Sequence, residues 1–238
     1  MKKRVLIIIA SVLAALAVVT GVYLGSYYRA ENVGAYLESG DAVDVREIKE
    51  GYFFDGKGKD KALIFYPGAN VEETAYAPLM KALAEQGVDC FLLRMPFRHA
   101  FAGMNKADRI IKEYKYTDYY LAGHSLGGAI AANYCAKHTD EFSGLFLLAA
   151  YPSEDISKAR FPVVFIYGEN DGVLNRQRLE KGFTLVPEDY KVIEIKGGNH
   201  SGVASYGEQR GDGKAEITAG EQQKETVKAI IESIERKD

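Results

Sequence analysis

The sequence predicts an α/β domain in which a mostly parallel sheet is covered by helices on both faces, and three observations support this fold class. Short, continuously apolar runs alternate with segments of helical periodicity, as at residues 61–66 and 88–93. Such runs are typical of strands buried on both faces. A Gly-x-Ser-x-Gly motif joins one run to a helical segment, and acidic, glycine and histidine residues follow two later runs. In a parallel sheet these positions meet beyond the carboxyl ends of the strands.

Composition sets the first limits on size and partners. The chain has 238 residues, of which 47% are hydrophobic, so it can bury the core of one α/β domain. Its formal charge of −3 gives no general attraction to nucleic acid. We see no internal repeat. Cys90 and Cys135 both fall in apolar segments, where buried free thiols are expected, although a bridge between them stays open.

Residues 1–25 are expected to be a membrane anchor. Basic residues at positions 2–4 precede an apolar run from Val5 to Gly25, long enough to cross a bilayer as a helix of roughly 30 Å. The positive-inside rule then places the rest of the chain outside the cytoplasm. A cleaved signal peptide is the alternative, because Ala15-Leu16-Ala17 resembles a cleavage site; the run continues beyond it, which favours an uncleaved single-pass anchor.

Residues 26–42 are expected to be a polar linker, and residues 43–238 a single α/β domain. Strands are predicted at 43–48 and 51–55, with residues 56–60 as a hairpin turn. The remaining predicted strands are 61–66, 88–93, 119–122, 143–149, 161–167 and 191–195. The predicted helices are 74–86, 106–114, the segment after Ser125, 175–182 and 221–236.

The strongest motif is Gly123-His124-Ser125-Leu126-Gly127, which lies between a predicted strand and a predicted helix. In this context Gly-x-Ser-x-Gly is typical of a sharp turn that lifts the serine hydroxyl clear of the sheet. Side chains at Gly123 or Gly127 would collide with neighbouring backbone. The helix that follows offers free N–H groups to a developing negative charge.

Two further residues follow the ends of later strands: Asp171 in Gly168-Glu-Asn-Asp-Gly, and His200 in Gly-Gly-Asn-His. A serine hydroxyl needs a histidine to take its proton and a carboxylate to orient that histidine. The chain order Ser125, Asp171, His200 is the one expected for this topology. Other candidates for the acid are Glu169, Glu154 and Asp155.

From about Val43 to its end, the chain resembles the α/β-hydrolases, and more narrowly the small dienelactone-hydrolase-like esterases that lack a cap. The resemblance implies Ser125 as nucleophile, His200 as general base and Asp171 as the orienting acid. Many members carry a His-Gly oxyanion loop, whereas residues 66–70 here read Tyr-Pro-Gly-Ala-Asn. Because the donors are backbone N–H groups, the resemblance still implies an oxyanion hole made by Leu126 and Ala69.

Only residues 151–160 separate the strands between which many family members insert a cap, so an open, shallow site is expected. Such a site suits a small acyl group or the accessible end of a larger molecule. The polar loop of residues 201–217, with Tyr206, Arg210 and Asp212, is expected to cover the site or contact substrate.

Neither a metal nor a cofactor is expected, because the four histidines are scattered and no ligand spacing is present. His124 is expected to support the turn rather than act as a base. The sequence thus predicts a membrane-tethered, extracytoplasmic serine hydrolase of small-molecule esters or thioesters. An amidase or acyltransferase on the same triad, and a non-catalytic binding protein of the same fold, remain alternatives. The oligomeric state stays open.

Overall fold

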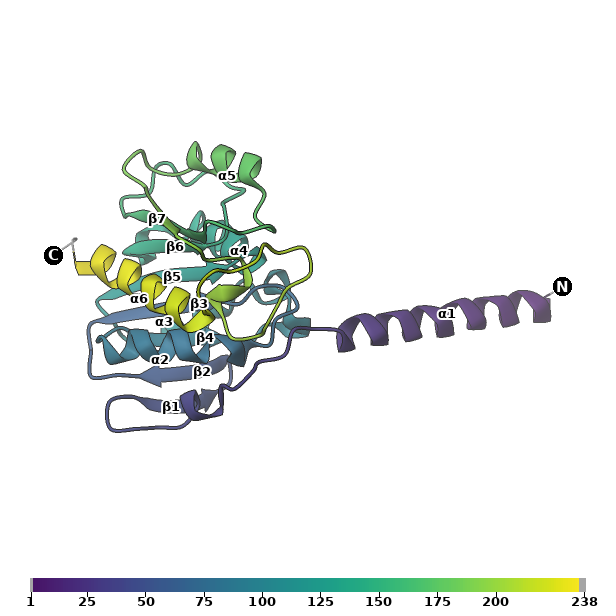
Figure 1. Ribbon diagram of the computed structural model, residues 1–238. Helices are drawn as coiled ribbons and strands as arrows, with labels where there is room; N and C mark the ends of the chain where they lie inside the picture. The colour runs from purple at the N-terminus through teal and green to yellow at the C-terminus, as the bar shows by residue number, and fades with distance from the viewer. Residues whose placement is uncertain (1, 236–238) are drawn as a thin grey trace.

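A computed structural model describes residues 2–235, apart from the side chains of residues 2, 6, 17–20 and 22–24. Its centre is one eight-stranded sheet in the order β1-β2-β4-β3-β5-β6-β7-β8 (Figure 1). Neighbouring strands from β4 to β8 in this order pair in parallel, and β2 pairs antiparallel with both of its neighbours, β1 and β4. The predicted mostly parallel sheet is confirmed. The strands are β1 (Asp44–Ile48), β2 (Gly51–Asp55), β3 (Lys61–Tyr66), β4 (Asp89–Leu93), β5 (Asp118–His124), β6 (Gly144–Leu148), β7 (Val163–Gly168) and β8 (Lys191–Ile195).

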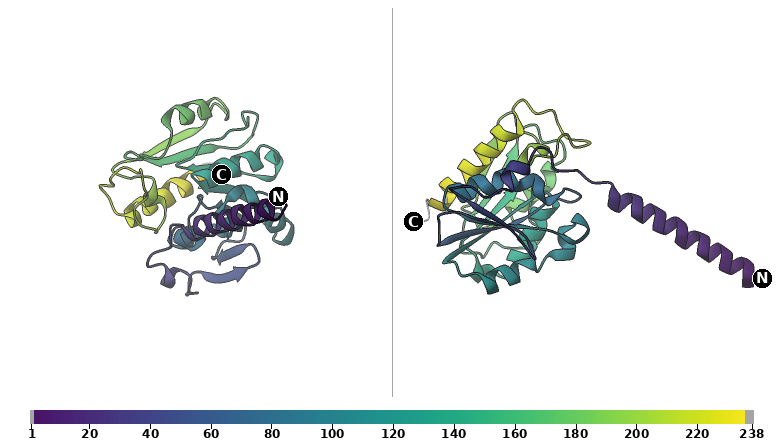
Figure 2. Two further views of the ribbon diagram at one scale, coloured as in Figure 1. Left: turned by 90° about the vertical axis from the view of Figure 1, so that its right-hand side faces the viewer. Right: turned by 90° about the horizontal axis from the view of Figure 1, so that it is seen from below.

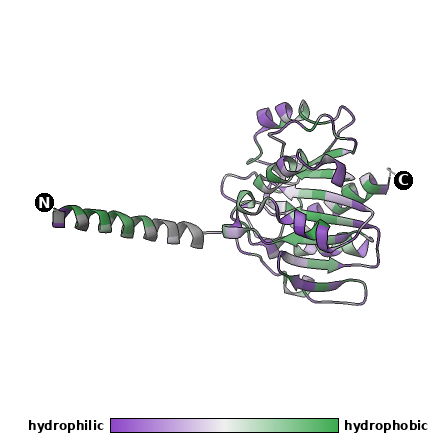
Figure 3. Ribbon diagram, turned by 180° about the vertical axis from the view of Figure 1, so that it is seen from behind, coloured by the Kyte–Doolittle hydropathy of each residue, from purple (hydrophilic) through white to green (hydrophobic). Residues whose placement is uncertain are grey.

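Helices cover both faces of this sheet, as predicted. Helices α2 (Ala77–Glu85) and α6 (Ala219–Glu235) pack on one face, and α3 (Lys106–Glu113), α4 (Leu126–Cys135) and α5 (Arg176–Phe183) on the other. Apolar side chains of the strands are therefore enclosed on both sides, which is why these strands read as continuous apolar runs (Figure 3). Arg236, the predicted end of the last helix, lies outside the described residues.

Cys90 and Cys135 are both buried and free, as expected. They belong to cores on opposite faces of the sheet, so no bridge joins them. Burial raises the pKa of the Cys135 thiol to about 12.

The predicted hairpin at residues 56–60 is wrong. Ile48 pairs with Gly51, so the tight turn is formed by Lys49 and Glu50 between β1 and β2. Strand β4 then pairs with β2, and residues 56–60 carry the chain past it to β3. The sequence pattern located the glycines but could not show which strands become neighbours.

Helix α1 (Lys2–Gly25) projects away from the domain (Figures 1 and 2). The membrane-spanning anchor predicted over these residues is not supported: within the described part of the chain, no helix combines the length and the apolar character that a membrane crossing needs. Part of the predicted run, the side chains at 6, 17–20 and 22–24, lies outside the description. The extracytoplasmic location stays a prediction.

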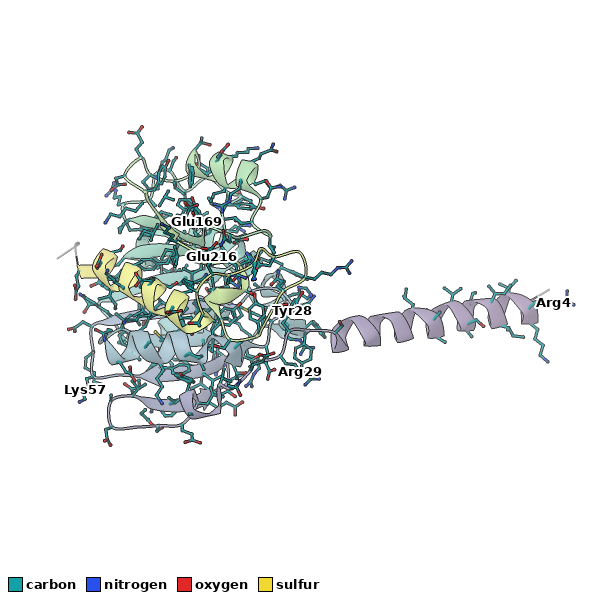
Figure 4. The ribbon with its side chains drawn as sticks, viewed as in Figure 1. Arg4, Tyr28, Arg29, Lys57, Glu169 and Glu216 are labelled. Atoms are coloured by element: carbon teal, nitrogen blue, oxygen red, sulfur yellow. The ribbon has the colours of Figure 1, made fainter. Side chains whose placement is uncertain are left out.

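The segment expected to be a linker is held against the domain. The Tyr28 N–H donates to the Asn70 carbonyl (2.8 Å), and the Tyr28 carbonyl accepts from the Glu72 N–H (2.9 Å). The Tyr28 ring lies 5.4 Å from the Tyr206 ring. Figure 4 shows Tyr28 where α1 meets the domain. This strap, residues 27–31, therefore borders the loop that follows β3.

Residues 149–162 connect β6 to β7 without a helix or strand, so the described structure has no cap at this position. The carboxyl ends of β5, β6 and β7 are left uncovered by any inserted domain.

The packing of α6 on the sheet yields a stability prediction. Ile230 is 0% exposed in the core on this face, whereas Lys228 on the same helix is exposed. Ile230→Ala should lower the free energy of unfolding by about 2–5 kcal/mol, because it leaves a cavity. Lys228→Ala should change it by less than about 0.5 kcal/mol. Urea unfolding of both variants checks this; equal effects would contradict the assigned packing.

Candidate active site

Ser125 lies at a strained turn between β5 and α4. Its backbone has φ 53° and ψ −125°, a conformation that residues with a side chain rarely adopt. The Ser125 N–H donates to the Leu148 carbonyl of β6 (2.9 Å), which fixes the turn against the neighbouring strand. The side chain is half-buried at the carboxyl end of the sheet, and Leu126 begins the helix.

The glycines around Ser125 permit this turn. A Cβ at Gly127 would lie 2.2 Å from the Pro67 carbonyl oxygen, and one at Gly123 would lie 2.7 Å from the Gly128 nitrogen. Neither contact is possible for a carbon atom, so both positions require glycine. The sequence expectation about collisions here is confirmed.

His200 and Asp171 meet beyond the ends of β8 and β7. His200 Nδ1 and Asp171 Oδ2 are 2.8 Å apart, and the two side chains are 2% and 0% exposed. The other oxygen of Asp171 accepts the N–H groups of Val173 (2.9 Å) and Leu174 (2.8 Å). These two bonds hold the carboxylate in a tight turn and leave Oδ2 for the imidazole. Because a carboxylate accepts, His200 carries a proton on Nδ1.

The other candidates for the acid lie elsewhere. Glu169 Oε2 accepts the Gly197 N–H (3.0 Å), and Glu169 lies beside Glu216 (Figure 4). Glu154 and Asp155 are exposed, and Asp155 accepts the N–H of Ser157. Among the candidates, only Asp171 contacts His200 in the described structure.

The loop after β3 carries the predicted Ala69 donor. Ala69 is half-buried, and two hydrogen bonds fix the loop beside it: the Gly68 N–H donates to Tyr76 Oη (3.0 Å), and the Asn70 N–H donates to the Arg98 carbonyl (3.0 Å). Within the described residues, neither the Ala69 N–H nor the Leu126 N–H has an acceptor. The Pro67 carbonyl packs against Gly127, so this loop borders the helix that Leu126 begins.

The sequence analysis did not identify Tyr76 as a site residue, and it gave His124 only a supporting role in the turn. His124 Nδ1 lies 2.8 Å from Tyr76 Oη, and the His124 ring centroid lies 4.6 Å from that of His200. Tyr76 stands at the end of the short helix η2 (Glu73–Tyr76), 48 residues from His124, and no sequence pattern connects the two. The only sequence feature that pointed to either residue was the position of His124 inside the Gly-x-Ser-x-Gly motif.

The loop of residues 201–217 holds the turn that carries His200, while several of its residues between 207 and 216 are exposed. Asp212 accepts the N–H groups of Gly172 (3.2 Å), His200 (3.1 Å) and Ser201 (2.8 Å). Tyr206 is buried against the strap. Asp212 therefore clamps together the turns that carry Asp171 and His200, and the expectation that this loop covers the site or contacts substrate stays a prediction.

Four large apolar side chains are exposed on the segments that follow β4, β5 and β7. Phe97 (65% exposed) and Phe101 (64%) follow β4, while Leu126 (39%) and Val173 (37%) adjoin Ser125 and Asp171. Phe97 and Arg98 both have left-handed backbones, with φ 55° and 58°. The hydrogen bond between Arg98 and Asn70 connects this unusual segment to the loop of Ala69. Strain of this kind concentrates at functional sites.

In the described part of the chain, no group of three or more acidic, cysteine or histidine residues is arranged to hold a metal ion. A family model for the alpha/beta hydrolase family matches residues 62–225. The chain belongs to the alpha/beta hydrolase family. No curated protein sequence matches it significantly.

Solved structures agree with this fold at low identity. MGS-MChE2, an alpha/beta hydrolase from a metagenome of lagoon sediments in Morocco, has a TM-score of 0.61 and 16% identity, with 83% of this chain and 100% of that chain covered. Est1E from Butyrivibrio proteoclasticus has a TM-score of 0.58, 16% identity and coverage of 82% and 99%. Mouse alpha/beta hydrolase domain-containing protein 10 has a TM-score of 0.60, 13% identity and coverage of 83% and 100%.

The glycine contacts of this hydrolase give a second prediction. Gly127→Ala should lower the free energy of unfolding by about 2–4 kcal/mol, because the added Cβ forces α4 away from the loop after β3. Gly220→Ala in α6 is the matched control, since a Cβ there meets nothing within 4 Å. It should be neutral or stabilise the fold by up to about 1 kcal/mol. Similar destabilisation by both substitutions, measured by urea unfolding, would contradict the close approach.

A third prediction concerns pH. Burial, reinforced by His200, lowers the pKa of His124 well below its ordinary value, so the folded protein keeps this ring neutral. The unfolded chain binds a proton there below about pH 6.5, and stability is lost as the pH falls through that value. The unfolding free energy should therefore fall between about pH 7.5 and pH 5.5, and His124→Phe should reduce that fall. An unchanged fall in the variant, measured by urea unfolding at both pH values, would refute this.

Proposed function

We propose that this chain is a serine hydrolase that cleaves carboxylic esters or thioesters through an acyl-enzyme. The observation that carries the proposal is the state of His200. Its Nδ1 is held by Asp171, while its Nε2 is buried and has no partner among the described residues. A buried nitrogen left without a partner is costly, and a base that takes a proton from serine uses this atom.

The reaction follows from these groups. Ser125 Oγ attacks the carbonyl carbon as His200 Nε2 takes its proton, and Asp171 stabilises the resulting imidazolium. The oxyanion receives the N–H groups of Leu126 and Ala69, the first of which begins a helix. The imidazolium then protonates the leaving alcohol or thiol. Water, deprotonated by the same histidine, releases the acyl group and regenerates Ser125.

The proposed substrates are esters with a small or accessible acyl group. The connection of residues 149–162 adds no cap, so nothing in the described structure at that position encloses a long chain. The exposed apolar side chains of Phe97, Phe101, Leu126 and Val173 offer contacts to an apolar substituent. The narrower assignment to the dienelactone-hydrolase-like branch stays a prediction.

The proposal predicts the behaviour of two variants. Ser125→Ala should lower kcat for p-nitrophenyl acetate by about 10⁴-fold or more, because no acyl-enzyme can form. Asp171→Asn should lower it by about 10²–10⁴-fold, because it disturbs the tautomer of His200. Ser39→Ala, an exposed serine near β1, should keep wild-type activity.

A fluorophosphonate probe followed by mass spectrometry identifies the nucleophile directly. Labelling at Ser125 alone, absent in Ser125→Ala, is the expected result. Labelling at another serine would refute the mechanism. A folded wild-type protein with neither labelling nor turnover would point instead to a binding protein that keeps the fold. Product analysis with amide substrates and alcohol acceptors separates hydrolysis of esters from amidase and transferase activity.

A further inference from the structure

A buried hydrogen-bond chain crosses the site behind Ser125. The Gly68 N–H donates to Tyr76 Oη (3.0 Å), and Tyr76 Oη lies 2.8 Å from His124 Nδ1. Tyr76 is 0% exposed and His124 is 1% exposed. A Cβ at Gly68 would lie 2.9 Å from His124 Nδ1, so the loop of Ala69 packs directly on this pair.

The available donors and acceptors indicate which group donates in each of these hydrogen bonds. Tyr76 Oη accepts from the Gly68 N–H, and if it also accepted from His124 Nδ1, the buried phenol proton would have no acceptor among the described residues. We therefore assign the tyrosine proton to the bond with His124 Nδ1. His124 is therefore the acceptor at Nδ1 and carries its own proton on Nε2. Burial raises the pKa of Tyr76 and lowers that of His124, so both groups are neutral.

The His124 ring also lies against the general base. The ring centroids of His124 and His200 are 4.6 Å apart at an interplanar angle of 44°. Asp171 holds His200 through Nδ1, and His124 limits the movement of the same ring from one side. In the proposed reaction His200 becomes a cation, so a neutral neighbour at this distance avoids the repulsion that a second imidazolium would cause.

We propose that Tyr76 and His124 are positioning residues that tie the oxyanion loop to the general base. Tyr76 holds Gly68, and thereby the adjacent Ala69 N–H, while the His124 that receives its proton packs on His200. The buried Tyr76–His124 pair thus sets the positions of the Ala69 N–H and of His200 relative to Ser125. Ser125 follows His124 directly in the sequence. This inference rests on the proposed function.

Three variants of the full chain test it with p-nitrophenyl acetate. Tyr76→Phe and His124→Phe should each lower kcat by about 10- to 100-fold with KM within about twofold, as small misplacements of reacting groups do. His124→Asn, whose side-chain oxygen can accept the Tyr76 proton, should recover activity relative to His124→Phe. The matched control is Tyr119→Phe, which removes a hydroxyl bonded to the Tyr114 carbonyl at the opposite end of β5 and should leave kcat unchanged.

The double variant separates positioning from a simple loss of packing. Because Tyr76→Phe leaves His124 Nδ1 without a donor, and His124→Phe leaves the hydroxyl without an acceptor, the effects should not add. The double variant, Tyr76→Phe with His124→Phe, should have a kcat no lower than that of the single variant with the lower kcat. Additive losses, or single variants with wild-type kcat, would overturn the inference.

A measurement independent of turnover is the tautomer of His124. Long-range ¹H–¹⁵N correlation spectra of the wild-type protein at neutral pH should show His124 protonated at Nε2 and not at Nδ1. A proton on Nδ1 would overturn the assignment of Tyr76 as donor and His124 as acceptor. If the wild-type protein hydrolyses no ester but His124 has this tautomer, the proposed function fails and the hydrogen-bond chain stands. If the wild-type protein hydrolyses esters and the variants at Tyr76 and His124 keep wild-type kcat, the proposed function stands and the positioning role fails.

Discussion

The site depends on one steric constraint, the close approach of α4 to β5 and to the loop after β3. A Cβ at Gly127 would collide with the Pro67 carbonyl, and one at Gly123 or Gly128 would collide with backbone on the other side of the turn between β5 and α4. This approach brings Ser125 into its strained conformation and places the first turn of α4 beside the Pro67 carbonyl. The N-terminus of α4 and the loop after β3 therefore lie against each other. Without glycine at these positions, the serine and the two amides would separate.

The second element of the site is a pair of interlocked turns after β7 and β8. Backbone bonds from Glu169 to Ile195 (2.9 Å) and from Asn170 to Gly198 (2.8 Å) join them. Gln222 of α6 accepts the Asn199 N–H (3.0 Å) and donates to the Asn199 carbonyl (2.7 Å), while Asp212 binds three amides nearby. The His200–Asp171 contact is thus held by a polar network. Buried polar groups that are fully bonded make such turns rigid.

Most elements could be predicted from periodicity because their strands are buried on both faces. Residues 61–66 and 191–195 begin and end as predicted, and the other parallel strands differ by one or two residues at most ends. The hairpin was misplaced because pairing of β2 with β4 is a long-range contact that no local pattern encodes. The strap around Tyr28 was missed for the same reason, since its partners are Asn70 and Glu72 on a distant loop. Within the expected anchor, residues 2–25 form a helix, and no helix of the described residues is long and apolar enough to span a membrane.

By itself the sequence determined the class of fold, the strained serine turn and the set of residues that reach the carboxyl edge of the sheet. These follow from local rules: apolar runs, glycine spacing and the order of polar residues after strands. Only the tertiary structure decided which acid meets His200, because Glu169 and Asp171 are two residues apart and differ in the direction that the turn gives each side chain. It also decided that Tyr76 reaches His124 across 48 residues. Such contacts depend on how helices and loops pack on the sheet, and no local pattern in the chain records that packing.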